Sequence, residues 1–93
     1  MNIYKKPSFF RDLKTISDPA LKERVGNVIL AVENAQSLKD IPKLKKMKGH
    51  RNSYRIKVGD YRIGVNIENN IVEFVAFGHR KDIYNFFRIN VKT

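Results

Sequence analysis

The clearest pattern in the chain is an alternation of apolar and polar positions between residues 53 and 77. A period of two predicts strands that bury one face, and the expected strands are 53–58, 61–67 and 71–77. Gly59-Asp60 and Asn69-Asn70 separate these runs, and both dipeptides favour the positive φ that tight hairpin turns need. This segment therefore predicts a three-stranded antiparallel meander.

Before the meander the apolar residues recur at helical spacing. Positions i, i+4 and i+7 predict a short helix over residues 9–16, with Ser8 as its N-cap. Asp18 followed by Pro19 then predicts the start of a second helix, and its apolar stripe continues to about Ala35. So short a connection between two helices predicts a helical hairpin.

The remaining segments complete the order of elements. Residues 2–6 predict a first strand, and residues 80–88 regain helical spacing. Residues 37–53 show no regular period, but four apolar side chains there are expected to anchor the segment to the core: Leu38, Ile41, Leu44 and Met47.

The resulting order, β-α-α-β-β-β-α, predicts a single α+β domain over residues 1–93. We expect a small antiparallel sheet with the N-terminal helical hairpin on one face and a basic concave surface on the opposite face.

Charge is the unusual feature of the composition. Nineteen Lys and Arg stand against nine Asp and Glu, for a net charge of +10, whereas a small domain needs only about 2–8 charges for solubility. A polyanionic partner follows: nucleic acid, an acidic protein or a membrane surface. The absence of cysteine excludes disulfides and thiolate metal sites and suits a reducing cytoplasm. No apolar run is long enough to span a membrane.

The hairpin of the meander concentrates this charge on one face. A two-residue loop at Gly59-Asp60 places Lys57 opposite Arg62, with Arg55 on the same face. Like charges in that position destabilise a sheet. One interpretation is a solvated outer face, but such faces usually mix Lys with Glu. The alternative, which we favour, is an anion-binding face.

Strand order brings further side chains toward Arg62. Arg80, after the third meander strand, is expected to join the basic face, and Tyr84 lies one helical turn farther on. Glu73 is the one acid that can belong to this face. For Tyr84 the alternative is a core aromatic, and for His79 it is an exposed or capping histidine.

This set of side chains suits RNA cleavage. Arginines and a lysine can neutralise a phosphodiester and the additional charge of its transition state. If the substrate is RNA, its own 2′-OH is the nucleophile, and the protein needs only a base and an acid. Neighbouring positive charge disfavours the charged form of Lys57, so Lys57 can serve as the base. Tyr84 is a base or an orienting group, and His79 is a possible acid.

Other basic residues near the hairpin are candidate RNA contacts. They are Lys45, Lys46, Lys48, Arg51, His79 and Lys81.

The stretch LKKMKGHRNSYRIKVGDYRIGVNIENNIVEFVAFGHRKDIY (Leu44 to Tyr84) resembles the RelE/ParE superfamily of bacterial and archaeal type II toxins. The resemblance covers essentially the whole chain. It implies a ribosome-dependent mRNA endonuclease that enters the ribosomal A site and uses the 2′-OH, with no metal or other cofactor.

The resemblance also assigns residues. It places the catalytic set on Arg55, Lys57, Arg62, Arg80 and Tyr84. The best-studied pattern has a lysine where this chain has Arg55, which keeps the charge but is a poorer base.

The resemblance further implies partners. They are an acidic cognate antitoxin in a hetero-oligomer, together with mRNA and ribosomal RNA, in the cytoplasm and away from membranes. Two other functions stay open on the same fold: a ParE-like inhibitor of DNA gyrase, and a non-catalytic relative that binds RNA or an antitoxin.

Overall fold

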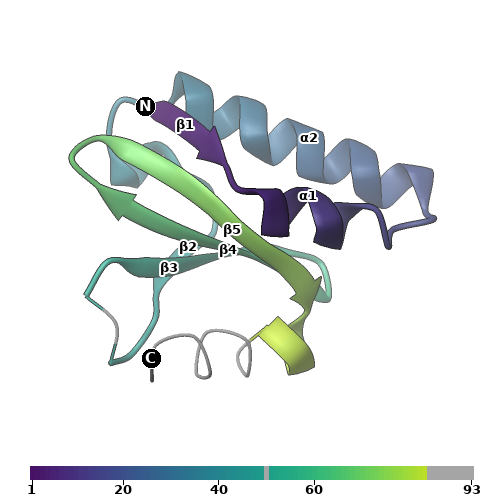
Figure 1. The fold of residues 1–93 in the computed structure, drawn as a ribbon. Helices are drawn as coiled ribbons and strands as arrows, with labels where there is room; N and C mark the ends of the chain where they lie inside the picture. Colours follow the sequence, from purple (N-terminus) through teal and green to yellow (C-terminus); the bar gives the residue numbers. More distant parts are fainter. Residues whose placement is uncertain (50, 84–93) are drawn as a thin grey trace.

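The computed structural model describes residues 1–49 and 51–83 (Figure 1). Its elements are β1 (Asn2–Lys5), α1 (Pro7–Leu13), α2 (Pro19–Asn34), the 3-10 turn η1 (Leu38–Asp40), β2 (Leu44–Lys46), β3 (Ser53–Val58), β4 (Tyr61–Glu68) and β5 (Ile71–His79). Residues 80–83 begin a further helix. The rest of the helix predicted over 80–88, including Tyr84, lies outside the described residues. No helix of the described ranges is long and apolar enough to cross a membrane.

The meander forms as the alternation predicts. β3, β4 and β5 pair antiparallel in the order of the chain. Gly59 has a φ of +60°, and Asn69 and Asn70 have φ of +52° and +63°, so both turns use the left-handed backbone that the dipeptides favour.

Two features of the sheet differ from the prediction. The five-stranded sheet has the order β1-β5-β4-β3-β2, and β1 pairs in parallel with β5, so the sheet is mixed rather than wholly antiparallel. β2 lies in the segment that was expected to be irregular, and it pairs antiparallel with β3. β2 has only three residues, of which Lys45 and Lys46 are charged, so it shows no alternation. Short, lysine-bearing edge strands also resist pairing with other chains.

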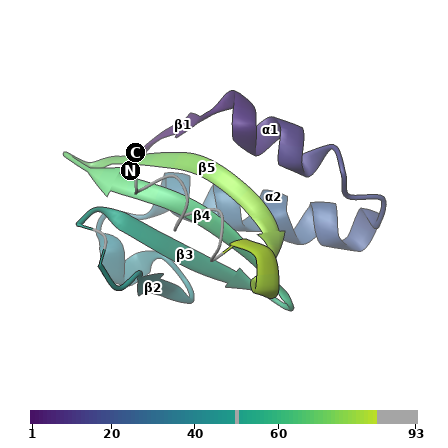
Figure 2. The same cartoon turned by 60° about the horizontal axis from the view of Figure 1, so that its bottom comes forward.

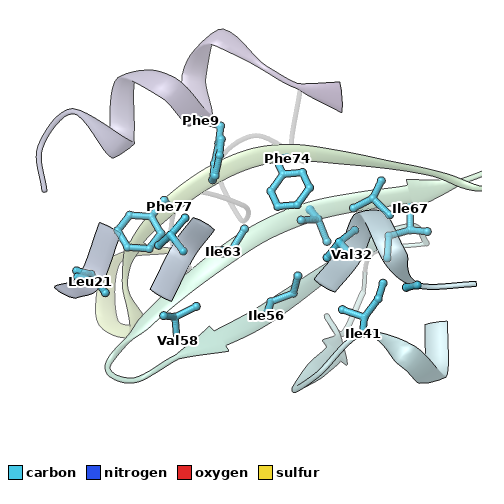
Figure 3. Packing of buried hydrophobic residues seen from close by; sticks show 14 of the residues in the cluster. Phe9, Leu21, Val32, Ile41, Ile56, Val58, Ile63, Ile67, Phe74 and Phe77 are labelled. Carbon is cyan, nitrogen blue, oxygen red and sulfur yellow. The ribbon is translucent and has the colours of Figure 1, made fainter. Parts of the chain in front are cut away.

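The helices and the sheet share one main core. α1 and α2 cover the same face of the sheet (Figure 1). The hairpin residues that alternate with the basic ones are buried or packed against the core: Tyr54, Ile56, Val58, Tyr61, Ile63 and Val65. Phe9 of α1 and Phe74 of β5 are fully buried, with ring centroids 5.2 Å apart (Figure 3). The alternation thus identified the buried face of the hairpin formed by β3 and β4.

A β-bulge interrupts the alternation of β5. Gly64 pairs with Ala76, but the next residue, Val65, pairs with Phe74, so Val75 is an extra residue. The extra residue of a bulge shifts the alternation, so the side chains that follow it point to the opposite face from the one that regular alternation predicts. Phe77 accordingly joins Phe74 in the main core.

The bulge also creates a second apolar cluster on the opposite face of the sheet. It contains Met47, Val75, Ala76 and Ile83. Of the four predicted anchors, Ile41 is in the main core and Leu44 packs against it. Met47 is also buried, as predicted, but in this second cluster. The prediction for Leu38 was wrong, because its side chain is 38% exposed.

Side chains of α1 bind the backbone at the bulge. Ser8 Oγ donates to Val75 O at 2.6 Å, and Phe77 N donates to Asp12 Oδ2 at 3.0 Å. β1 ends at Lys5 and pairs only as far as Phe74, so α1 supplies the partners that β5 lacks beyond that point. Ser8 is therefore not the predicted N-cap. α1 begins at Pro7, with Lys6 in the cap position.

Candidate active site

The basic face of the hairpin forms in the predicted register. Lys57 lies opposite Arg62, and Lys45 on β2 lies opposite Arg55. Directly paired residues share a face, and this one is opposite the buried set of the hairpin, so it points away from α1 and α2. Figure 2 shows the sheet with α2 behind it.

The arginines of this face influence one another. Burial lowers the pKa of Arg62, the positive charges of Arg55 and Arg80 lower it further, and the carboxylate of Asp60 raises it. Arg55 belongs to β3, Arg62 to β4 and Arg80 to the helix that follows β5. The structure therefore brings together three cations from three elements, which we call the arginine cluster.

Backbone contacts hold the cluster in place. Arg62 Nη1 donates to Gly59 O at 2.8 Å and to Tyr61 O at 2.9 Å, so the guanidinium is fixed against its own turn. A guanidinium has five N–H donors. Both bonds come from Nη1, so the N–H groups of Nη2 and Nε can bind a ligand. Arg80 N donates to Asp60 O at 2.9 Å, which attaches the start of the last helix to the same turn.

The side chains of the site differ in exposure. Lys57 and Arg80 are exposed, whereas Arg55 and Arg62 are half-buried. Partly desolvated cations that lie close together repel one another more than exposed ones. An anion that binds between them relieves that repulsion, so this arrangement favours a phosphate.

The other candidate RNA contacts are spread over more than one surface. Lys45 shares the face of the arginine cluster, but Lys46 pairs with Tyr54 and therefore points to the other side of the sheet. Lys48 and Arg51 are exposed between β2 and β3, and Lys81 is exposed after β5.

His79 is separated from the arginine cluster. It pairs with Tyr61, and the two rings meet edge to face with centroids 5.5 Å apart. His79 also lines a cavity of about 370 Å³ together with Asp18 and Leu21 of α2 and its cap. The bulge at Val75 places His79 on the helical side of the sheet and Arg80 on the basic side. The alternation of apolar and polar residues in β5 does not predict this exchange.

A row of polar side chains on the basic face was not predicted from the sequence. Ser53 Oγ donates to Asn66 Oδ1 at 2.9 Å, and Asn66 Nδ2 donates to Glu73 Oε1 at 3.4 Å. Lys6 Nζ lies 3.8 Å from the same Glu73 oxygen. Alternation places these residues on the face, as expected for Glu73, but the contacts depend on the register across β3, β4 and β5.

Comparison with known proteins gives matches over almost the whole chain. A family model described as the ParE toxin of the type II toxin-antitoxin system parDE matches residues 3–84. Toxin RelE3 of Methanocaldococcus jannaschii is 36% identical over 88 residues, which are 94% of this chain and 99% of that protein.

Solved structures give the same result. The toxin-antitoxin complex RelB-RelE from Methanococcus jannaschii contains a chain that matches with a TM-score of 0.76 and 35% identity, over 89% of this chain and 96% of that one. The YoeB dimer from Staphylococcus aureus matches with a TM-score of 0.69 at 18% identity, over 86% and 97% of the two chains, and this second likeness concerns the fold alone.

Proposed function

Since the chain belongs to the RelE/ParE superfamily of type II toxins, we propose that it is a ribosome-dependent mRNA endonuclease. As a RelE-like toxin of a toxin-antitoxin system it acts by stopping translation. The observation that carries the proposal is the arginine cluster, in which the positive charges of Arg55 and Arg80 lower the pKa of the half-buried Arg62.

The cluster suits a phosphodiester that gains negative charge during reaction. The ribose 2′-oxygen attacks phosphorus, the bond from phosphorus to the 5′-oxygen breaks, and a 2′,3′-cyclic phosphate forms. One proton leaves the 2′-OH and another is added to the 5′-oxygen. Preorganised cations stabilise the pentacoordinate transition state, and removal of one such donor typically costs about 10²–10³ in rate.

Lys57 and Tyr84 remain the candidates for proton transfer. Lys57 lies opposite Arg62 and is exposed to an incoming substrate. Tyr84 lies outside the described residues, and its role follows from the resemblance. His79 is on the helical side next to Tyr61, so we assign the acid to Tyr84 rather than to His79.

The proposed partners are mRNA and ribosomal RNA in the A site and an acidic antitoxin. RelE from Methanococcus jannaschii was solved in complex with RelB, and a net charge of +10 suits either partner. We propose a cytoplasmic toxin-antitoxin hetero-oligomer, because ribosomes are the target.

Primer extension on mRNA in a translating extract tests the proposal. The wild-type toxin should give cuts in phase with codons that disappear when ribosomes are omitted. Arg62→Ala should remove them, whereas Arg11→Ala, an exposed arginine on α1, should not. Codon-phased cuts that persist in both Arg62→Ala and Arg80→Ala would contradict the site assignment.

Inhibition of DNA gyrase is the second candidate, because the matching family model is described as ParE. A gyrase poison would induce the DNA-damage response while translation continues. Intact transcripts together with cleaved DNA would favour it over the endonuclease.

A further inference from the structure

Besides joining three strands, the hydrogen bonds of the polar row on the basic face orient the side-chain amide of Asn66. Ser53 on β3, Asn66 on β4 and Glu73 on β5 are paired in register. Asn66 lies four residues from Arg62 on β4, a distance of about 13 Å along the strand. Glu73 is an acid on a face that is mainly basic near the hairpin, and a phosphate-binding role does not explain it.

The contacts of Asn66 determine which way its amide points. Glu73 Oε1 lies 3.4 Å from Asn66 Nδ2, and an ionised carboxylate can only accept hydrogen bonds. The nitrogen of the amide must therefore face Glu73, which turns Oδ1 toward Ser53, whose hydroxyl donates at 2.9 Å. Lys6 Nζ also lies 3.8 Å from Glu73 Oε1.

Among residues 1–49 and 51–83, the oriented amide keeps one donor and one acceptor free. An amide nitrogen has two hydrogens and its oxygen has two lone pairs, and the strands on either side use one of each. Because those partners lie to the left and right of β4, the remaining N–H and lone pair share the edge that faces away from the sheet. Asn66 is half-buried rather than covered, so this edge can be reached.

We propose that Asn66 reads a base of the RNA, and that this base is adenine. The inference rests on the proposed function. A neighbouring donor and acceptor on one amide match the N6 amino group and N7 of adenine. On that edge guanine offers two acceptors, and the pyrimidines have no ring nitrogen. Sequence-specific RNA recognition generally uses such edges of unpaired bases. Because Asn66 stands about 13 Å along β4 from Arg62, it contacts a nucleotide near the one that is cut and not the cut nucleotide itself.

Two neighbours support this subsite. Glu73 is a positioning residue, because it sets the direction of the Asn66 amide. Tyr4, which pairs with Glu73, is 53% exposed and offers a ring on which a base can stack, an interaction that tolerates any base.

Binding of short uncleavable RNA tests the proposal. Fluorescence anisotropy compares a 2′-O-methyl uridine hexamer with hexamers that carry one adenine or one cytosine at a scanned position. We expect the wild-type toxin to bind the best-placed adenine hexamer about fivefold tighter or more. Asn66→Ala should bind the hexamers equally, and Asn27→Ala, a matched exposed asparagine on α2, should keep the preference.

Glu73→Gln is the second variant, needed if Asn66→Ala does not fold. A glutamine amide can donate or accept, so the Asn66 amide is free to turn over and the preference for adenine should fall. A role that only fastens the strands together would change stability but leave the relative affinities unchanged. The proposal is wrong if the wild-type toxin shows no adenine preference, or if the folded variants retain one.

Failure of the inference is distinguishable from failure of the proposed function. If the wild-type toxin prefers adenine but never cuts mRNA, the endonuclease is refuted and the base-reading role stands. If the wild-type toxin and Asn66→Ala cut the same mRNA at the same sites with the same frequencies, the base-reading role is refuted and the endonuclease stands.

Discussion

Replacement of Asp12 tests how α1 holds the bulge of β5. Asp12→Ala removes the carboxylate that accepts the 3.0 Å hydrogen bond from Phe77 N, and Phe77 is buried. A hydrogen bond to a charged group contributes about 1.5–3 kcal/mol, and a buried donor left without a partner costs a similar amount. Because Asp12 itself is half-buried and water can replace part of the contact, we expect a loss of about 2 kcal/mol.

The structure also predicts how the stability losses of different substitutions at this contact rank. Asp12→Asn keeps an acceptor without its charge, so the loss should be about 1 kcal/mol, and Ser8→Ala should cost about 1 kcal/mol for its neutral bond to Val75 O. Both contacts hold one bulge, so the double variant should deviate from additivity. A domain has only about 5–15 kcal/mol of stability, so the double variant should remain folded but weakened.

Urea unfolding followed by far-UV circular dichroism measures these losses. Glu23→Ala, an exposed acid on α2, is the control and should stay within about 0.5 kcal/mol of the wild-type protein. Hydrogen exchange at the Phe77 amide should accelerate in Asp12→Ala. If Asp12→Ala is as stable as Glu23→Ala and the Phe77 amide is equally protected, α1 does not hold the bulge and the reasoning is wrong.

Three further predictions concern the core, the turn and the site. Phe9→Ala should destabilise by about 3–5 kcal/mol in urea unfolding, because Phe9 is fully buried, whereas Phe10→Ala, 47% exposed, should cost less than about 1 kcal/mol. Gly59→Ala should lower the stability by about 1–2 kcal/mol, since its φ is +60° and a new Cβ would lie 3.1 Å from Arg24 Nη1; an equally stable variant would contradict this. Arg62→Gln should reduce mRNA cutting at least about 100-fold yet change stability by less than about 1 kcal/mol, because burial lowers the pKa of Arg62. Because the pKa of Arg62 is lower in the folded state, the unfolded state binds the guanidinium proton more tightly, and the charge opposes folding at every pH below the folded pKa. The difference in stability between Arg62→Gln and the wild-type protein should therefore stay constant between about pH 6 and 9.

The hairpin was predictable because its turn has a fixed length. A two-residue loop leaves one register, and that register places Lys57 opposite Arg62, as the structure shows. The parallel pairing of β1 with β5 was not predictable in this way, since nearly seventy positions separate Asn2 from its partner Ile71. β2 was missed because its three residues contain no alternation.

Asn66 illustrates a different limit. Its position on the basic face follows from alternation, but its orientation does not. The direction of the amide depends on two neighbours, Ser53 and Glu73, that come from other strands. A candidate base-reading residue of this kind is visible only when the register is known.

The bulge decides which residue at the end of β5 reaches the arginine cluster. By strict alternation from the buried Phe74, residue 79 would share a face with Arg62, and residue 80 would point toward the helices. The extra residue, Val75, reverses this order, so that Arg80 influences Arg62 while His79 contacts Tyr61. Ser8 and Asp12 bind the backbone on either side of Ala76, on the far side of the sheet from any substrate. The charge of the site therefore depends on a helix that does not contact it, and we expect substitutions in α1 to reduce RNA cleavage in variants that still fold.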